Sequence, residues 1–343
     1  MNYATAGESH GPELTVIVED LPAGLPLSAE ALSADLARRQ LPLGAGGRMA
    51  IERDEAIVTS GVMAGLTTGS PVAMRIVNRN HAAWKGRAVD AYTVARPGHA
   101  DEAACVKYGY DDIRPALERA SARETAARVA AGACARALLA QFGIEVTSRV
   151  VALGGETDPA RFADAVSAAA NAGETLGGVI EVRATGLPVG LGSHVRAERR
   201  LDARLAGAVM GVQAIKGVEF GAGFALAAMK GTETRGEMGG VTGGISDGSP
   251  LVLRAAMKPI PTTRAPQPAK DLATGAPAQT VYERSDVCPV PRAAVVLEAV
   301  VAMVLADELQ RKLGGDSLAE MRPRFAALPK SAAVSAEPKV FWP

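Results

Sequence analysis

Aromatic residues are scarce in this sequence: Phe, Trp and Tyr make up 4% of its 343 residues, although 48% of the residues are hydrophobic. The core of such a protein must be filled mainly by Ala, Val and Leu. Nucleic-acid bases stack on aromatic rings, so this scarcity argues against a nucleic-acid partner. Lys and Arg together number 37, as do Asp and Glu, so no net positive charge attracts a phosphate backbone. Any anion-binding site must therefore be local.

Cysteine is also rare. Cys105, Cys134 and Cys288 lie far apart and form no Cys-x-x-Cys pair, which excludes the usual zinc and disulfide patterns and suits a reducing cytosol. The sequence has no apolar run of about 18 residues, the length that a membrane-spanning helix needs. The first residues lack the basic and apolar regions of a signal peptide. We therefore expect a cytoplasmic protein that binds no metal and does not enter a membrane.

The most informative stretch lies between residues 96 and 132. It begins with the loop Arg-Pro-Gly-His-Ala-Asp, which carries His99 and Asp101. A helix is expected to follow, because Ser121 and Glu124 have the spacing of a capping box. We expect this helix to run to about Phe142, where a glycine can end it.

Three arginines of this stretch, Arg119, Arg123 and Arg128, cluster at the expected start of the helix. The helix dipole disfavours cations at that end, so the cluster needs an external reason. An anion held by the free N–H groups and the guanidinium groups would supply one. The alternative is that the arginines are solvated on a surface turn.

Other glycine-containing segments also carry polar or basic residues. His10 lies beside Gly11, where the backbone can approach a ligand closely, and the glycine loop 42–47 follows Arg38 and Arg39. The densest glycine run, 239–248, precedes a basic turn and predicts a phosphate cradle. The alternatives remain a structural histidine, arginines that complement a helix dipole, and a glycine hinge.

The remaining pattern indicates mixed secondary structure. Strict alternation of strands and helices is missing, and no Gly-x-Gly-x-x-Gly motif follows the first strand, which argues against a Rossmann cofactor site. The expected strands are 14–18, 51–58, 72–77, 146–153, 179–184 and 251–256, and the expected helices are 28–39, 159–171, 201–210 and 295–309.

Taken together, several motifs resemble those of the chorismate synthase family, in the same order, from residue 3 to about 320. The resemblance implies an α+β fold, a sandwich in which helices pack between antiparallel sheets, and a homotetramer. We expect one catalytic domain over 1–325 and a loosely held tail over 326–343. The motifs are Gly7–Gly11, Arg96–Asp101, Lys107–Gly109, Arg123–Gly132, Thr175–Val179, Met257–Pro259, Arg284–Asp286 and Gly314–Leu318.

The resemblance also implies an activity. It is the shikimate-pathway conversion of 5-enolpyruvylshikimate 3-phosphate to chorismate and phosphate, a 1,4-anti elimination. The family reaction needs reduced FMN without net redox change, and NADPH is a candidate reductant. One alternative is a non-catalytic anion-binding or assembly protein on the same scaffold. A second is a flavin oxidoreductase, against which the missing dinucleotide motif counts.

The family's functional residues can be placed on this sequence. The catalytic residues fall on His10, His99 and Asp286, and an arginine for a substrate or NADP phosphate falls on Arg39. Where relatives commonly carry a further arginine this chain has Ala45, and we expect Arg48 to compensate. A family asparagine aligns with Gly236. The implied FMN contacts are Arg119, Ala120, Ser121, Gln213, Ala214, Gly243, Lys258, Pro259, Ile260, Pro261, Thr262 and Arg284.

Overall fold

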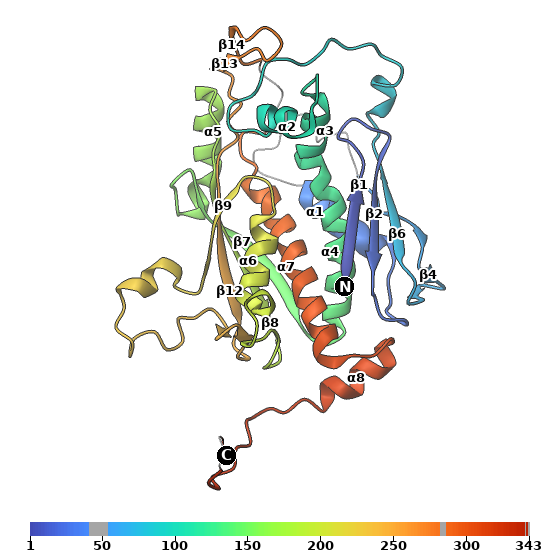
Figure 1. Ribbon diagram of the computed structural model, residues 1–343, viewed down its shortest axis with the longest axis vertical. Helices are drawn as coiled ribbons and strands as arrows, with labels where there is room; N and C mark the ends of the chain where they lie inside the picture. Colours follow the sequence, from blue (N-terminus) through green and yellow to red (C-terminus); the bar gives the residue numbers. More distant parts are fainter. Residues whose placement is uncertain (41–53, 282–285, 340, 342–343) are drawn as a thin grey trace.

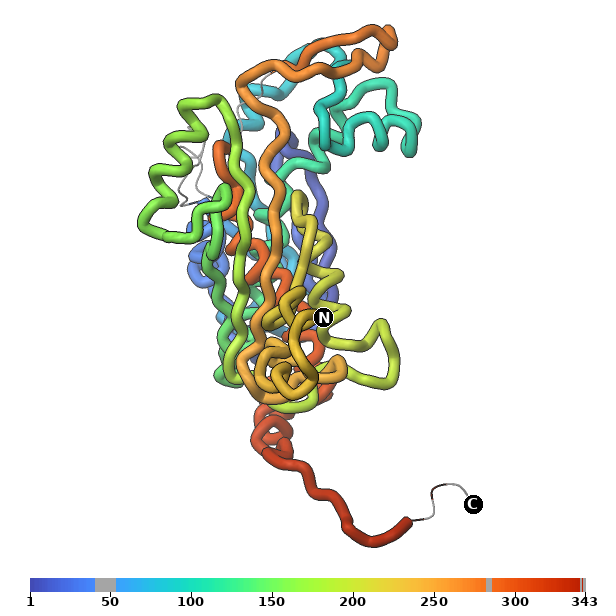
Figure 2. Tube along the Cα trace, turned by 90° about the vertical axis from the view of Figure 1, so that its left-hand side faces the viewer, coloured from blue at the N-terminus to red at the C-terminus, as the bar shows by residue number. Residues whose placement is uncertain are grey.

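Two four-stranded antiparallel sheets enclose a layer of helices in the computed structural model of this protein (Figures 1 and 2). The structure describes residues 1–40, 54–281, 286–339 and 341. This is the expected α+β sandwich, with helices between antiparallel sheets.

The first sheet has the strand order β1-β2-β6-β3. Alternate residues of β2 face the helices, so Leu14, Val16 and Val18 are buried while Ile17 is exposed on the outer face. The strand expected at 72–77 is confirmed, whereas the one expected at 51–58 begins outside the described residues. The strands are β1 (Asn2–Ala6), β2 (Glu13–Glu19), β6 (Val72–Val77) and β3 (Ile57–Ser60).

The second sheet has the order β7-β8-β12-β9, again antiparallel throughout. Its inner face is aliphatic and small: Ile180, Val182 and Ala184 of β8 lie beside Leu253 and Ala255 of β12, all buried. The strands expected at 146–153, 179–184 and 251–256 are confirmed, and the sheet has one further strand. The strands are β7 (Glu145–Leu153), β8 (Gly178–Thr185), β12 (Leu251–Met257) and β9 (Ile215–Phe220).

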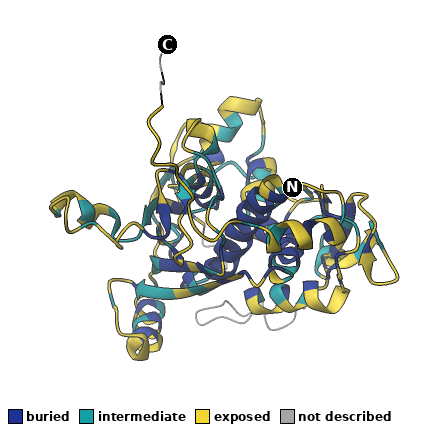
Figure 3. Ribbon diagram, turned by 90° about the horizontal axis from the view of Figure 1, so that it is seen from below, coloured by how far each residue is buried: buried dark blue, intermediate teal, exposed yellow. Residues whose placement is uncertain are grey.

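The helix layer contains α1 (Ala29–Gln40), α4 (Thr125–Ala140), α6 (Leu201–Met210) and α7 (Val290–Leu313). Most residues of α4 and α7 are buried, whereas α1 and α6 each bury one side; Figure 3 shows the buried residues gathered in the interior and the exposed ones around it. The helix predicted at 201–210 has those bounds, and the apolar helix predicted at 295–309 is confirmed but extends further at both ends. A long helix that is apolar on all sides is stable only when it is enclosed in this way.

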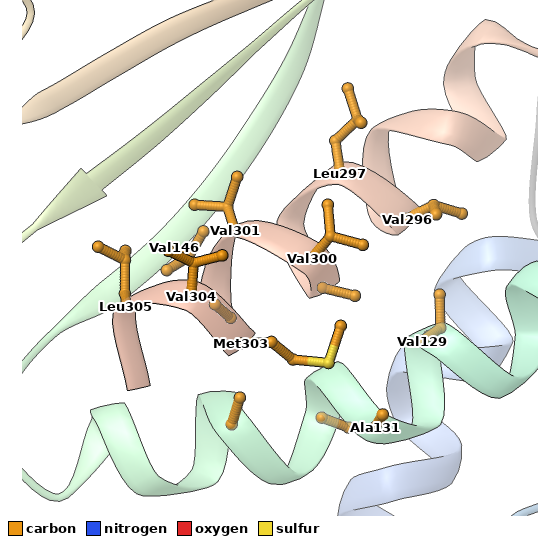
Figure 4. Packing of buried hydrophobic residues seen from close by; sticks show 14 of the residues in the cluster. Val129, Ala131, Val146, Val296, Leu297, Val300, Val301, Met303, Val304 and Leu305 are labelled. Atoms are coloured by element: carbon orange, nitrogen blue, oxygen red, sulfur yellow. The ribbon is translucent and has the colours of Figure 1, made fainter. Parts of the chain in front are cut away.

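Helices α4 and α7 lie unusually close together because small residues meet between them. A Cβ atom placed on Gly132 would lie 2.3 Å from the Cβ atom of Ala299, so only glycine fits there. Further along, Met303 of α7 fills the space toward Ala131 of α4 (Figure 4). Close approach of Ala- and Gly-rich helices is how a chain with few aromatic residues reaches a dense core.

The start of α4 differs from the prediction. The hydroxyl of Ser121 accepts a hydrogen bond from the Arg123 N–H at 3.3 Å and caps a single 3₁₀ turn, after which α4 begins at Thr125. The Glu124 carboxylate does not return to Ser121, because other side chains bind it, so the predicted capping box is wrong. A capping box is formed instead by Ser317 and Glu320 at the start of α8 (Leu318–Ala326).

Smaller elements surround these layers. Residues 329–339 follow α8 and are exposed, and the division into a domain at 1–325 and a tail at 326–343 remains a prediction. None of the helices in the described ranges is both long and apolar enough to cross a membrane. The smaller elements are α2 (Asp101–Tyr108), α3 (Arg114–Ala120), α5 (Phe162–Ala172), β4 (Val62–Met63), β5 (Leu66–Thr67), β10 (Val241–Thr242), β11 (Ile245–Ser246), β13 (Pro268–Lys270) and β14 (Pro277–Gln279).

Candidate active site

The end of α1 and the start of α4 meet at a buried arginine. The side chain of Arg39 is only 3% exposed. Its Nε donates to the hydroxyl of Thr125 at 3.0 Å, and a terminal nitrogen donates to the Ala122 carbonyl at 2.9 Å. Burial, which the charge of Asp54 opposes and the nearby cations Arg292 and Arg123 reinforce, lowers the pKa of Arg39 to about 10. Arg39 therefore belongs to an interior cationic cluster and not to a solvated helix end.

Two carboxylates accompany this cluster. Asp54 lies 2.6 Å from a guanidinium nitrogen of Arg123 and 3.6 Å from one of Arg39. At the first turn of α7, Arg292 pairs with Asp286 at 2.6 Å. Within the described part of the chain, the three guanidinium groups share these two carboxylates. The Nε and one terminal nitrogen of Arg292 are buried without a hydrogen-bond partner, so this site has donors ready for an anionic oxygen.

The loop after β1 places His10 beside α3. The ring Nδ1 of His10 lies 2.8 Å from one oxygen of Glu118, and the main-chain N–H of His10 donates to the other oxygen at 2.7 Å. The ring packs against Trp84, with the ring centroids 4.6 Å apart. Next to His10, the hydroxyls of Ser9 and Ser121 are 3.1 Å apart, which connects this loop to the start of α4.

The arginines predicted to need an anion are bound largely by the protein itself. Arg119 donates to the carbonyl of Thr5 at 2.9 Å and to its hydroxyl at 2.7 Å. Arg128 pairs with Glu124 at 2.9 Å, and the amide of Gln213 donates to the same carboxylate at 3.3 Å. The clustering of Arg119 and Arg128 therefore does not by itself require a ligand. The alternative of solvated arginines fits Arg119, which is exposed, but not Arg128, whose side chain is largely covered.

The basic turn after β12 closes the site from the second sheet. The Lys258 N–H donates to the Ala214 carbonyl at 3.0 Å, and Ala214 has the left-handed φ of +68°, so the two predicted segments lie side by side. Burial, followed by the charge of Lys216, lowers the pKa of Lys258. The carbonyl oxygen of the Gln213 side chain is buried without a hydrogen-bond partner.

The loop that carries His99 touches this turn. A Cβ atom on Gly98 would lie 3.2 Å from the ring of Pro261, so the two loops are in direct contact. The ring Nδ1 of His99 lies 3.2 Å from the Pro97 carbonyl. Burial lowers the pKa of His99, and the Arg96 guanidinium lowers it further, so the ring is neutral at pH 7. A small pocket beside the turn is lined by Thr262, Thr263 and Asp286, among others.

The structure does not bring every predicted residue to this place. Gly243 lies in the β10–β11 hairpin, which contacts Gly192 and precedes the first residue of β12. Lys258 follows the last residue of β12, at the opposite end of that strand. Gly236 is exposed on the segment before the same hairpin. Arg284, Arg48 and Ala45 lie outside the described residues. Within the described ranges, the His, Cys, Asp and Glu side chains form no cluster that could hold a metal ion.

Sequence reasoning missed several residues of the site, among them Asp54, Trp84, Glu118 and Arg292. A signal existed for Glu118: a carboxylate in the last turn of a helix is disfavoured by the helix dipole, so it calls for an external partner. The contact between Asp286 and Arg292 also had a local signal, since the two residues are near in sequence. Asp54 and Trp84 are placed by the tertiary fold alone.

Comparisons with known proteins agree on one family. A sequence model of the chorismate synthase family matches residues 1–310. The chorismate synthase of Caldanaerobacter subterraneus subsp. tengcongensis is 49% identical over 340 residues, covering 95% of this chain and 97% of that protein. The one from Geobacter sulfurreducens is 48% identical over 382 residues, with the same shares covered. A solved structure titled "Crystal Structure of Chorismate Synthase" matches with a TM-score of 0.77 and 37% identity, over 95% of this chain and 96% of that one.

Proposed function

Since the chain belongs to the chorismate synthase family and is therefore an enzyme of the lyase class, we propose that it converts 5-enolpyruvylshikimate 3-phosphate to chorismate and phosphate. The proposed reaction is a 1,4-anti elimination with reduced FMN as cofactor and no net redox change. The observation that carries the proposal is the cationic cluster of Arg39, Arg123 and Arg292, which meets the requirements of a phosphorylated substrate.

The charge balance of the cluster supports a phosphate ligand. Among the described residues, two carboxylates, Asp54 and Asp286, pair with these three arginines. Because the depressed pKa of Arg39 reports a buried cation among like charges, an added anion would relieve that cost. The unpartnered nitrogens of Arg292 would donate to phosphate oxygens, and such charge-assisted bonds hold a leaving group as its charge develops.

The residues around Glu124 and Lys258 fit a flavin phosphate and ring. Arg119, Ala120 and Ser121 end α3, and Gln213 and Ala214 lie against Lys258. The unpartnered amide oxygen of Gln213 and the half-buried ammonium of Lys258 would bind polar atoms of the cofactor. When bound, reduced FMN supplies the electron-rich ring on which the family's elimination depends. Gly243 is placed for this role only by the family resemblance.

Two histidines provide proton transfer at different positions. We assign His99 as the acid toward the departing phosphate, because its loop contacts the Lys258–Thr262 turn. His99 is neutral in the free protein, and an adjacent phosphate dianion would favour its protonated form. We assign His10 as the donor that keeps the bound flavin in its required charge state. Asp286 relays the proton removed from the substrate, with Arg292 holding its carboxylate.

The proposal extends to properties that follow from the family alone. We propose a cytoplasmic homotetramer, for which light scattering in solution gives a direct mass. NADPH is a candidate reductant for the flavin. The proposal also retains Arg48 as a phosphate contact and Arg284 as a flavin contact.

An anaerobic assay tests the proposed activity. The enolpyruvyl phosphate substrate is incubated with the protein, with and without photoreduced FMN, and chorismate and phosphate are both measured. We expect equal amounts of the two products, and only with reduced FMN. Phosphate binding without any product under either condition would favour the alternative of a non-catalytic anion-binding protein. Net oxidation of the flavin in step with product would favour an oxidoreductase.

A further inference from the structure

His10 is fixed by a single carboxylate from two directions. Glu118 binds the main-chain N–H of His10 at 2.7 Å with one oxygen and the ring Nδ1 at 2.8 Å with the other. Both carboxylate oxygens are therefore committed to the same residue. The side chain of Glu118 is 11% exposed and that of His10 is 21% exposed, so water does not readily replace these bonds.

The protonation state of Glu118 determines where the ring proton lies. Burial raises the pKa of Glu118, but the hydrogen bonds and the charge of His10, together with Arg114, bring it below its ordinary value. Glu118 is therefore an ionised carboxylate at neutral pH and can only accept hydrogen bonds. The ring Nδ1 must then carry a proton. Neutral His10 is the Nδ1–H tautomer, and Nε2 is the nitrogen that gains or releases a proton.

We propose that Glu118 is a positioning residue that fixes the Nδ1–H tautomer of His10 and so commits its Nε2 to proton transfer. The kinetic part of this proposal rests on the function proposed above, in which His10 is a proton donor. The tautomer itself is a property of the protein alone. A proton donor with a fixed ring orientation loses less freedom on reaching the transition state, which is why such a contact matters for rate.

The loop has other anchors, so Glu118 is not required merely to hold it. The side-chain amide of Asn78 donates to the carbonyls of Ser9 at 3.0 Å and of Gly11 at 2.9 Å. The ring of His81 donates through Nδ1 to the His10 carbonyl at 3.0 Å. These contacts hold the main chain of the loop independently of Glu118. On the His10 side chain itself, Glu118 binds the ring Nδ1 and the ring of Trp84 packs against the imidazole.

The position of Glu118 is unfavourable for the stability of its own helix. It lies in the last turn of α3 (Arg114–Ala120), where the negative end of the helix dipole disfavours a carboxylate. A neutral residue would suit the helix better. The placement is explained by the partner, because the Glu118 carboxylate binds both the main chain and the ring of His10 from this position.

The variant Glu118→Gln tests the proposal through the tautomer. An amide has one acceptor oxygen, and the main-chain N–H of His10 can use only that oxygen, so the amide NH₂ group then faces Nδ1. Nδ1 must become an acceptor, and the proton moves to Nε2. Nitrogen-15 NMR of histidine-labelled protein at alkaline pH, where imidazole is neutral, distinguishes the tautomers. The chain has 4 histidines, and the His10 signals are those missing from a His10→Gln variant.

We expect the Nδ1–H tautomer in the native protein and the Nε2–H tautomer in Glu118→Gln. We also expect kcat of this variant to fall about tenfold to a hundredfold, the scale of a mispositioned acid, with the substrate KM and the FMN affinity within about twofold. The matched control is Glu8→Gln, which removes the same charge from an exposed position in the same loop and should keep the native tautomer and kcat.

Three results would overturn the proposal. They are an Nε2–H tautomer in the native protein, an unchanged tautomer in Glu118→Gln, and a switched tautomer with native kcat. The first needs no change at Glu118, so the proposal stays testable even where Glu118→Gln fails to fold. If the native protein produced no chorismate while the tautomers behaved as expected, the proposed function would be wrong and the role of Glu118 in fixing the ring would stand.

Discussion

Asp286 and Arg292 form an ion pair with 2.6 Å between a carboxylate oxygen and a guanidinium nitrogen, at the point where α7 begins. The pair joins two roles that the sequence left as alternatives. A paired aspartate can serve as a structural anchor, and it can also be a base whose position is fixed by its partner. Arg292 keeps two further buried nitrogens without partners, so the pair does not use up its donors.

Replacing the carboxylate separates the two roles. Asp286→Asn keeps the shape of the side chain and removes its basicity, so a proton-relay role predicts a turnover about 10²- to 10⁴-fold lower with FMN affinity retained. FMN titration, thermal melting and turnover are measured on the same preparation. Arg292→Gln is the companion variant. Equal losses of stability, FMN affinity and activity in both variants would mean that Asp286 only pairs with Arg292.

His99 is expected to be required for turnover. Replacing it with Ala removes the acid assigned to the departing phosphate, and turnover should fall by about 10²- to 10⁴-fold. Product formation is measured with reduced FMN at saturating substrate. His194→Ala, at an exposed position, is the control for loss of a histidine elsewhere. Near-native turnover of His99→Ala would remove His99 from the mechanism.

The same histidine should give the protein a distinct pH dependence. Burial lowers the pKa of His99 below the ordinary value of 6.5, so in the unfolded chain this residue takes up a proton at a higher pH than in the folded protein. The free energy of unfolding therefore decreases as the pH falls through that value. Between about pH 7.5 and 5.5, the native protein should lose more stability than His99→Gln, as measured by urea unfolding. Parallel curves for the two proteins would contradict this prediction.

The loop near Ala45 is tested by adding the arginine that relatives commonly carry. Ala45→Arg should lower the substrate KM with little change in kcat, since one charge-assisted contact is worth about 1.5–3 kcal/mol of uniform binding. Arg48→Ala should raise KM, and more strongly in the native background than beside Ala45→Arg. Simple additivity of the two changes would mean that Arg48 does not compensate for the missing arginine.

Gly132 allows a test of the helix packing. Gly132→Ala places a methyl group 2.3 Å from the Cβ atom of Ala299, and overpacking of this kind costs about 1–3 kcal/mol. The melting temperature should fall, and Ala299→Gly in the same chain should recover most of the loss. Gly207→Ala in α6 is the matched control, because no atom lies within 4 Å of the added Cβ, and it should stabilise by up to about 1 kcal/mol. Equal changes of the melting temperature in Gly132→Ala and Gly207→Ala would contradict this prediction, because they would show that α4 and α7 move apart at little cost.

The bounds of helices and strands could be predicted best where buried apolar residues recur with a regular spacing. The strand at 72–77 and the helix at 201–210 have the predicted bounds because their apolar residues follow the period of one element. Ser121 and Glu124 show the opposite case. Their spacing fits a capping box, but Glu124 is bound by Arg128, one helical turn further on, and by Thr5 and Gln213, which are distant in sequence.

The site follows the same rule. The family resemblance identified His10, His99 and Asp286, but the tertiary fold determines which residues contact and orient them. Glu118 is 108 positions from His10, and Asp54 is 69 positions from Arg123. Neither pairing leaves a periodic trace, because an ion pair needs only two side chains and any loop length can connect them. Arg39 was assigned from its family position, and its burial depends on the start of α4.

The close contact between α4 and α7 at Gly132 and Ala299, here called the seam, has a consequence beyond stability. Arg123 precedes α4 and Arg292 belongs to the first turn of α7, so the separation of these two helices determines how densely positive charge is gathered where the phosphate is expected. Pressure can reduce the distance between α4 and α7, and with it the distance between Arg123 and Arg292. Hydrostatic pressure should therefore alter affinity for phosphate before it unfolds the protein, and substitutions that widen the seam should make the enzyme selective for larger or less charged anions.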